Sequence, residues 1–430
     1  MTQLSGESAE ITASPTEAKG RFELTPIRLP VLATFGALIL GLGLGVGLSG
    51  VSLSETLTES VALLGNLWLR ALQMTIIPLV ASLLVLGLAQ MVDAARAGKA
   101  ARQFVGLVVG VALAGGVFTA LALPIALEWF PIPDTASGFL ADSSQEAGDV
   151  PGVLEFLKSL VAPNIVAAAA DTAMLPVTIF FALLAVAITR LPSEQSDLLL
   201  RFFHAMANAM LQIIGWVLWI APIGVAALAF GVGLKSGGGA FAALAHYIML
   251  VSAMGGFILI LAYAVAWTAG GVGLSTFARA VVPAQAVAVS TQSSLASLPA
   301  MLDSASRLGL RSSTSEFVLP LAVAIFRATS VAMNLAVALY VAKLAGVEVP
   351  PALVGIGILV ALIISVGSVS LPGSISFVVS IGPIALAMGV PIEPLALLVA
   401  VEMLPDIMRT LGNVTMNVAV TSVVDRPEAD

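Results

Sequence analysis

The run Ser365-Val366-Gly367-Ser368-Val369-Ser370-Leu371-Pro372-Gly373-Ser374 interrupts an apolar segment, 349–392, that carries no charge. The apolar arms on either side have about 15 residues each, or roughly 22 Å as helix. Each arm is therefore too short to cross a hydrocarbon core of ~30 Å. The pattern predicts a re-entrant helical hairpin, whose tip must be buried in protein or face a water-filled cavity.

A second uncharged segment, 280–302, is broken in a similar way by Ser290-Thr291-Gln292-Ser293-Ser294 and by Pro299. For either segment alone, an ordinary kinked span or a tight extracellular loop is the alternative interpretation. Both segments are followed by a long helix that carries charges, so they look like a repeat. Paired broken segments of this kind point to the binding site of a transporter.

The composition indicates a membrane protein of the all-α class. The chain has 430 residues, of which 59% are hydrophobic and 10% are charged, whereas soluble domains carry about 25% charged residues. Nucleic-acid binding is not expected, because no basic stripe is present. The absence of cysteine excludes disulfides and thiolate metal sites, and two histidines are too few for an imidazole metal cluster. We expect neither a cofactor nor a metal.

Hydropathy and charge also predict the orientation of the first spans. Apolar spans are expected near 29–49, 61–90, 103–129, 164–190, 198–230 and 241–270. Lys and Arg should lie in cytoplasmic loops, and they cluster before the first span, between the second and third, and after the fourth. The loops at 50–60 and 130–157 contain neither residue. This alternation predicts a multi-pass protein of the inner (plasma) membrane with a cytoplasmic N-terminus, preceded by a disordered tail at 1–28.

The helix expected at 392–424 carries a polar stripe. Its members are spaced by 4, 3, 4 and 4 residues and are Glu402, Asp406, Arg409, Asn413 and Asn417. At about 100° per residue they fall within roughly 80° of arc. Such a stripe must face protein or water rather than lipid, and intramembrane ionisable groups usually mark a substrate or ion pathway. The alternative is a salt-bridge network that only holds helices together.

Arg327 is a further charge within an apolar helix expected at 314–344, with no other charged residue between Glu316 and Lys343. A guanidinium at that depth requires a partner. Glu402 and Asp406 are the candidates, and with Arg409 the four groups would sum to zero charge.

Two other patterns carry no function. The run Gly45-Val46-Gly47-Leu48-Ser49-Gly50 matches GxGxxG but ends an apolar span and follows no strand, so dinucleotide binding is not expected. These glycines favour close helix packing instead. The pair Ser293-Ser294 has no histidine close to it in the sequence, so a serine-nucleophile enzyme is not expected either.

The motifs together resemble those of glutamate transporter homologues, the dicarboxylate/amino acid:cation symporters. The matching runs are Ser293-Ser294-Leu295-Ala296-Ser297-Leu298-Pro299 and Ser365 to Gly373 for the two hairpin tips, Asp406-Ile407-Met408-Arg409-Thr410 with Asn413-Val414-Thr415 for the last helix, Leu175-Pro176 with Thr178-Ile179-Phe180-Phe181-Ala182, and Ala221-Pro222-Ile223-Gly224-Val225. The resemblance covers roughly residues 28–424.

The resemblance implies a homotrimer in membrane lipid, with eight transmembrane helices and two re-entrant hairpins. A rigid scaffold and a moving transport domain would form an elevator. The expected parts are scaffold helices 1–2 at 29–97, transport-domain helix 3 at 98–130, scaffold helices 4–5 at 152–230, and a transport domain at 240–430, with hairpin 1 near 278–308, helix 7 near 314–344, hairpin 2 near 350–388 and helix 8 near 392–424.

The resemblance also implies a substrate. Asp406 matches the residue that holds the substrate amino group, and Arg409 matches the one that pairs with its side-chain carboxylate, a geometry that suits guanidinium. The pocket would be completed by Thr410, Asn413, Ser293, Ser294, Ser330 and Leu371. Neutral amino acid carriers of the family lack the arginine, and dicarboxylate carriers lack the aspartate. Both are present here, so aspartate or glutamate is expected.

The family's sodium ligands are largely missing. The helix-7 signature Asn-Met-Asp-Gly-Thr is matched by Phe326-Arg327-Ala328-Thr329-Ser330, and the sodium-binding aspartate of the last helix is matched by Asn417. The ligands of helix 3 are matched by apolar residues near 107–112. We therefore predict sodium-independent transport in which Arg327 replaces a bound cation.

Several alternatives remain beside this prediction. Arg327 either shapes the pocket permanently, giving a uniporter or exchanger, or Glu402 or Asp406 takes up a proton with the substrate, since buried carboxylates readily titrate. Sodium could instead bind carbonyls of hairpin 2 near Ser365 and Ser368. A receptor or a leak channel on the same fold is a different class, and the lack of a signalling domain disfavours the receptor.

Overall fold

The computed structural model describes residues 30–426 except 52, 97, 134–160, 237–238 and 368–372. Within this part every regular element is a helix. The first nine are α1 (Val31–Leu48), α2 (Glu55–Gln73), α3 (Ile76–Arg96), α4 (Lys99–Trp129), α6 (Ile165–Ala170), α7 (Met174–Ile188), α8 (Ser193–Trp219), α9 (Ala221–Ser236) and α10 (Gly239–Thr268). The expected tail at 1–28 lies outside the described residues.

The second half contains the two expected hairpin segments and the charged helices. Its helices are α11 (Leu274–Thr291), α12 (Leu298–Arg307), α13 (Ser312–Ile325), α14 (Ser330–Leu344), α15 (Pro351–Gly367), α16 (Gly373–Ala387), α17 (Leu395–Leu398) and α18 (Met403–Asp425). Both broken segments are thus pairs of helices, α11 with α12 and α15 with α16. The tip of the second pair, with Leu371, lies outside the described residues.

Several helices suit a membrane. Five described segments are long and apolar enough to cross one: Glu55–Asp93, Lys99–Trp129, Ser193–Trp219, Phe241–Thr268 and Ser312–Leu344. Shorter apolar helices accompany them at Leu32–Leu48, Met174–Ile188, Ala221–Leu234 and Pro351–Val366. This agrees with a multi-pass integral membrane protein.

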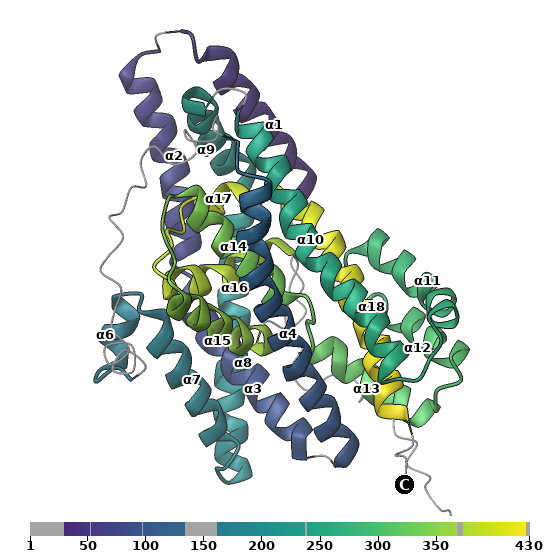
Figure 1. Ribbon diagram of the computed structural model, residues 1–430. Coiled ribbons are helices and arrows are strands. Elements are labelled where there is room, and N and C mark those ends of the chain that lie inside the picture. The colour runs from purple at the N-terminus through teal and green to yellow at the C-terminus, as the bar shows by residue number, and fades with distance from the viewer. Residues whose placement is uncertain are drawn as a thin grey trace, which may run out of the picture.

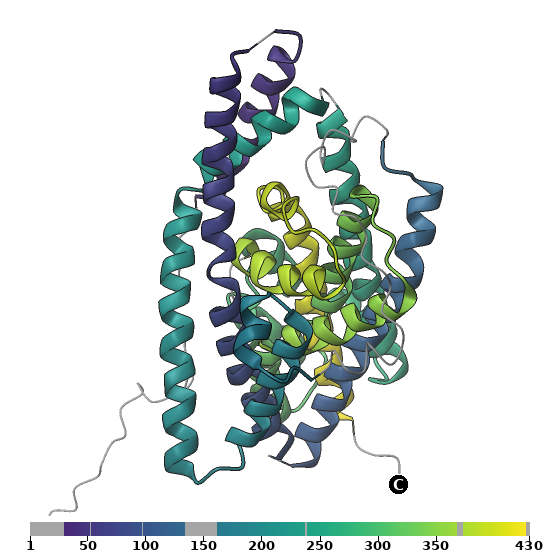
Figure 2. The ribbon, with the colours of Figure 1, turned by 90° about the vertical axis from the view of Figure 1, so that its left-hand side faces the viewer.

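Helices α1 and α9 pack closely because α1 presents glycine to its neighbour (Figure 1). A Cβ added to Gly41 would lie 2.5 Å from the carbonyl oxygen of Ala226, and one added to Gly45 would collide with the backbone of Phe230. Gly45 of the GxGxxG run is therefore a helix-packing glycine, as predicted, whereas nothing lies within 4 Å of a Cβ at Gly47 or Gly50, so the prediction is wrong for these two. Seen from the side, α8 runs alongside α2 and α3 (Figure 2).

Helix α18 is surrounded by the other helices of the second half. It runs alongside α10, and α11, α12 and α13 gather around its C-terminal part (Figure 1). Buried apolar side chains such as Ile258, Phe277, Val318 and Val420 form the core between them. As a result the polar stripe of α18 faces protein.

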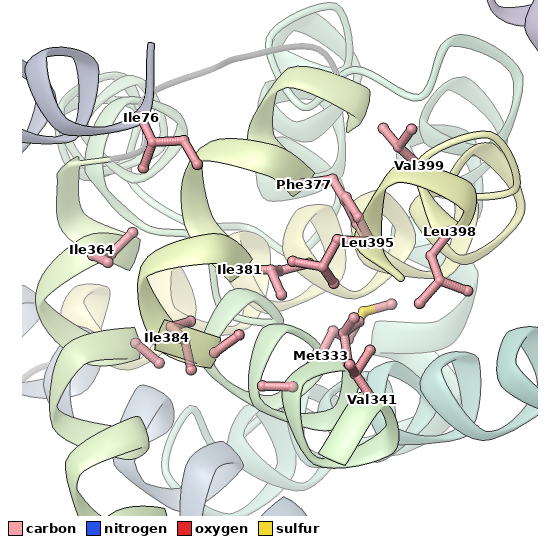
Figure 3. Close-up of a cluster of buried hydrophobic side chains, with 14 of the residues drawn as sticks. Ile76, Met333, Val341, Ile364, Phe377, Ile381, Ile384, Leu395, Leu398 and Val399 are labelled. Carbon is pink, nitrogen blue, oxygen red and sulfur yellow. The ribbon is translucent and has the colours of Figure 1, made fainter. Parts of the chain in front are cut away.

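A second core joins α16 to the helices beside it. Figure 3 shows Phe377, Ile381 and Ile384 of α16 among side chains from α14, α15 and α17, including Met333, Ile364 and Leu395. All of them are buried. This core anchors the second arm of the second hairpin segment.

Prolines lie at interruptions of helices that the apolar runs predicted to be continuous. The expected span at 198–230 consists of two helices. Helix α8 ends at Trp219, and α9 starts at Ala221, directly before Pro222. The expected helix at 392–424 starts only at Met403, after α17 and a run of turns. Pro405 has no N–H to continue the preceding turn, and Leu404 N–H instead donates to Val401 O over 3.0 Å. The expected span at 61–90 is longer and consists of α2 and α3.

Candidate functional site

The expected helix at 314–344 is broken at Phe326–Thr329, next to α18. Phe326 is extended, with φ −111° and ψ 103°, so α13 ends there and α14 starts again at Ser330. The side chain of Asn413 on α18 bonds the groups of Thr329 at this break. Its Oδ1 accepts from the backbone N–H of Thr329 over 2.9 Å and from the Thr329 hydroxyl over 3.0 Å.

Gly412 permits this close approach. A Cβ at that position would lie 2.5 Å from Cγ2 of Thr329. The carbonyl oxygen of Arg409 lies 3.2 Å from the Thr329 hydroxyl and is a second acceptor for its hydrogen. The break is therefore fixed to α18 by side-chain hydrogen bonds, which is how non-helical backbone is tolerated at membrane depth.

The guanidinium of Arg409 makes two hydrogen bonds and one further ion-pair contact. Nη2 donates to Oε1 of Glu402 over 2.7 Å, and Nη1 donates to Oδ1 of Asn334 over 2.8 Å. Nε lies 3.4 Å from Oδ1 of Asp406. The side chains of Arg409, Glu402 and Asp406 are 5%, 1% and 8% exposed. Burial of charges at this level requires such mutual pairing.

Two further groups complete the cluster. The hydroxyl of Tyr247, on α10, donates to Oε2 of Glu402 over 3.3 Å. Arg327, partly buried in the helix break, is within electrostatic range of Asp406 and Arg409. Asp406 therefore interacts electrostatically with two guanidinium groups, and the four ionisable side chains Glu402, Asp406, Arg327 and Arg409 balance to zero formal charge.

The remaining predicted residues lie at different distances from this cluster. Ser330 is buried at the start of α14, and Thr410 is buried one residue after Arg409. Ser293 and Ser294 form the tip between α11 and α12, where Ser293 O accepts from the Ser297 hydroxyl over 2.8 Å. Among the described residues no hydrogen bond joins this tip to the cluster.

Asn417 differs from the rest of the stripe. It is fully buried, and neither its amide nitrogen nor its amide oxygen has a hydrogen-bond partner within the described part of the chain. The structure therefore brings the N-terminal part of the stripe into the cluster and leaves Asn417 apart from it, further along α18.

Sequence reasoning missed Tyr247, Asn334 and Thr329. Each is a polar residue within a largely apolar segment, and a polar residue in such a segment is the signal that could have found them. The sequence does not reveal that these three residues bond to α18, because they lie on α10, on α14 and in the helix break, far from α18 along the chain.

The cluster is suited to a small ligand that carries both signs of charge. A guanidinium binds a carboxylate through parallel hydrogen bonds, and a carboxylate such as Asp406 binds an ammonium group. Buried charged groups in the interior of a membrane helix bundle are typical of a transporter site.

The comparisons with known proteins agree with this class. Residues 31–427 match the model of the sodium:dicarboxylate symporter family, and the chain belongs to that family. Its members are transporters and not enzymes, so this is a membrane transporter. The match confirms the resemblance to glutamate transporter homologues.

Three relatives show the range of the family. Neutral amino acid transporter A of Bos taurus is 28% identical, over 89% of this chain and 79% of its own length. The proton/sodium-glutamate symport protein of Bacillus subtilis (strain 168) is 26% identical, over 92% and 91%. The proton/glutamate-aspartate symporter of Escherichia coli (strain K12) is 26% identical, over 85% and 84%.

Proposed function

We propose that this chain carries aspartate or glutamate across the inner (plasma) membrane without sodium, with Arg327 in place of a bound cation. It would work as an elevator within a homotrimer, with its N-terminus in the cytoplasm. Two relatives are named for glutamate transport, with a proton or with sodium as the coupling ion.

The observation that carries the proposal is the pairing of Arg409 with Glu402 and Asp406 in a buried site. The pair Asp406 and Arg409 offers one group to each end of an acidic amino acid. A neutral amino acid would leave the buried guanidinium without a side-chain carboxylate from the substrate, and a plain dicarboxylate would leave Asp406 without an ammonium. Both mismatches are costly in a buried site.

Arg327 supports the sodium-free version. It lies in the helix break, where the family resemblance matches a sodium-binding signature, and it interacts electrostatically with Asp406. A fixed guanidinium there supplies the positive charge that a bound cation would bring. It also repels a cation at the same place, since like charges within a few ångströms oppose each other strongly in a low dielectric.

Glu402 supports a role for the proton. Its carboxylate occupies Nη2 of Arg409, one of the two terminal nitrogens through which a substrate carboxylate would bind. An acidic amino acid has one net negative charge, so adding it to a cluster of zero charge leaves an excess. A proton on Glu402 removes that excess and releases the guanidinium. Without the proton, the substrate-bound cluster keeps one net negative charge, Arg327 only shapes the pocket, and the protein would be an exchanger or uniporter.

Competition in proteoliposomes tests the substrate class. The purified protein is loaded with unlabelled aspartate, and uptake of labelled aspartate is measured against aspartate, glutamate, alanine, serine and succinate. The proposal expects competition from the acidic amino acids only. Competition by alanine or serine would assign a neutral amino acid carrier, and competition by succinate alone would assign a dicarboxylate carrier.

A further inference from the structure

A second set of hydrogen-bonded polar groups is centred on His246 and contains none of the proposed substrate-binding residues. His246 is on α10, next to Tyr247, and is partly buried. Its Nε2 is 2.9 Å from the carbonyl oxygen of Phe130, which follows the last residue of α4. Its Nδ1 is 3.1 Å from the hydroxyl oxygen of Tyr340 on α14.

Hydrogen-bond accounting limits the protonation state of this ring. The Phe130 carbonyl can only accept, so Nε2 must carry a hydrogen. The Tyr340 hydroxyl has a single hydrogen and lies 3.1 Å from Ala243 O; while it donates there, toward His246 it can only accept. In that arrangement Nδ1 carries a hydrogen as well, and a ring with hydrogens on both nitrogens is the imidazolium cation.

The position of Phe130 favours the same cation. Phe130 caps the C-terminus of α4, a helix of 31 residues. The last carbonyl groups of a helix lack partners within the helix and carry partial negative charge, so a positively charged side chain is stabilised there. The neutral arrangement requires the Tyr340 hydroxyl to turn away from Ala243 and donate to Nδ1.

The group also contacts the substrate cluster. The rings of Tyr340 and Tyr247 meet edge to face, with centroids 5.4 Å apart, and the Tyr247 hydroxyl donates to Glu402 over 3.3 Å. The titratable groups facing His246 are therefore Tyr340 from α14 and, through Tyr247, Glu402 at the start of α18. The nearest charges along the packed helices are Glu128 on α4 and Lys343 on α14, both exposed.

We propose that His246 is a proton-binding site, whose imidazolium ties the end of α4 to α10 and α14 and whose charge state is passed through Tyr340 and Tyr247 to Glu402. Imidazole is the side chain that ordinarily changes charge near neutral pH. The proton on His246 would thus change how readily the Glu402–Arg409 ion pair breaks when the substrate binds. Only this last consequence rests on the proposed function.

The site itself is tested without substrate. The chain has two histidines, His204 and His246, so nitrogen NMR of protein labelled in histidine is assigned by His204→Gln. The proposal expects both ring nitrogens of His246 to be protonated at neutral pH, and Tyr340→Phe to change that spectrum. A ring with one unprotonated nitrogen that accepts from Tyr340 would overturn the proposal.

The transport consequence needs variants with opposite effects. In proteoliposomes, His246→Gln should show, at every pH, the uptake that the unaltered protein shows at high pH. His246→Arg should show, at every pH, the uptake that the unaltered protein shows at low pH. Both should vary less than about twofold between about pH 5 and 8, the range in which imidazole titrates. His204, which bonds Asn208 within α8, supplies the control, and His204→Gln should keep the original profile.

An unchanged profile in both His246 variants would overturn the link to Glu402. Thermal unfolding of each variant by intrinsic fluorescence separates loss of fold from loss of proton binding. If the unaltered protein carries no acidic amino acid, the proposed function fails, but the NMR result still decides the proton site.

Discussion

Nη2 of Arg409 lies 2.7 Å from Oε1 of Glu402, and the side chains of both residues are almost completely buried. A carboxylate of the protein therefore occupies a guanidinium nitrogen that an acidic substrate would need. Under the proposed function, substrate binding is an exchange of one carboxylate for another. Because Arg327 is already counted in the neutral cluster, the substrate-bound pocket stays neutral only if a proton compensates the added charge.

Replacing Glu402 by Gln tests this exchange. The amide carries no charge and competes less well for Arg409, so the affinity for aspartate should rise. Accumulation driven by a pH gradient should be lost, while exchange of aspartate for aspartate continues. Radiolabelled uptake under a pH gradient and in counterflow measures both. Asp303→Asn is the control, because Asp303 pairs with Arg307 at an exposed i,i+4 site. A Glu402→Gln protein that still accumulates aspartate with a pH gradient would rule out Glu402 as the proton carrier.

Substituting Arg409 by Met should abolish selection for the acidic side chain. Loss of one partner of a buried charge pair costs about 2–5 kcal/mol, or roughly 30-fold or more in aspartate affinity. Serine, which should not compete with aspartate in the unaltered protein, should then compete about as well as aspartate does. Arg307→Met is a matched control, since the Arg307 side chain is 54% exposed. A variant that binds neither amino acid and has lost its cooperative thermal unfolding would mean that Arg409 supports the fold rather than the substrate.

Arg327 should be needed for sodium-free transport. Arg327→Met removes the charge that faces Asp406, so uptake in choline buffer should fall at least tenfold, a change of about 1.4 kcal/mol. Arg327→Lys keeps the charge and should retain part of the activity. The comparison of these two variants in the same buffer separates charge from shape. Full activity of Arg327→Met without sodium would exclude a cation-replacing role.

The packing of α1 on α9 predicts opposite effects for two glycines of the same helix. A Cβ at Gly41 would lie 2.5 Å from Ala226 O, whereas nothing lies within 4 Å of a Cβ at Gly43. Gly41→Ala should lower the free energy of unfolding by about 1–3 kcal/mol, the usual cost of overpacking. Gly43→Ala should be neutral or stabilising, because alanine favours helix. Thermal unfolding in detergent measures both, and equal melting temperatures would contradict the packing.

The parts of the fold that depend on local pattern could be predicted from the sequence. Apolar runs gave the helices, and the Ser/Pro-rich tips at 290–299 and 365–374 marked the interruptions between α11 and α12 and between α15 and α16. Helix continuity was overestimated at 198–230, at 314–344 and at 392–424. At Phe326–Thr329 the reason is tertiary, because Asn413 replaces the helical partner of the Thr329 N–H.

The candidate site also contains residues that the sequence predicts and residues that it does not. Glu402, Asp406, Arg409 and Asn413 share one helical face, and their spacing revealed them. The partners from other helices, Asn334 and Tyr247, could not be deduced, because no local periodicity records which helix packs against α18. The same holds for His246, whose role depends on a carbonyl at the end of α4 and a hydroxyl on α14.

Sodium-free transport of an acidic amino acid can be measured by exchange in matched buffers. Purified protein in liposomes loaded with unlabelled aspartate is diluted into labelled aspartate, with either sodium or choline as the monovalent cation on both sides of the membrane. Equal initial rates and equal final exchange are expected in the two buffers. Uptake that requires sodium would contradict sodium-free transport and would mean that the cation binds elsewhere in the pocket despite Arg327.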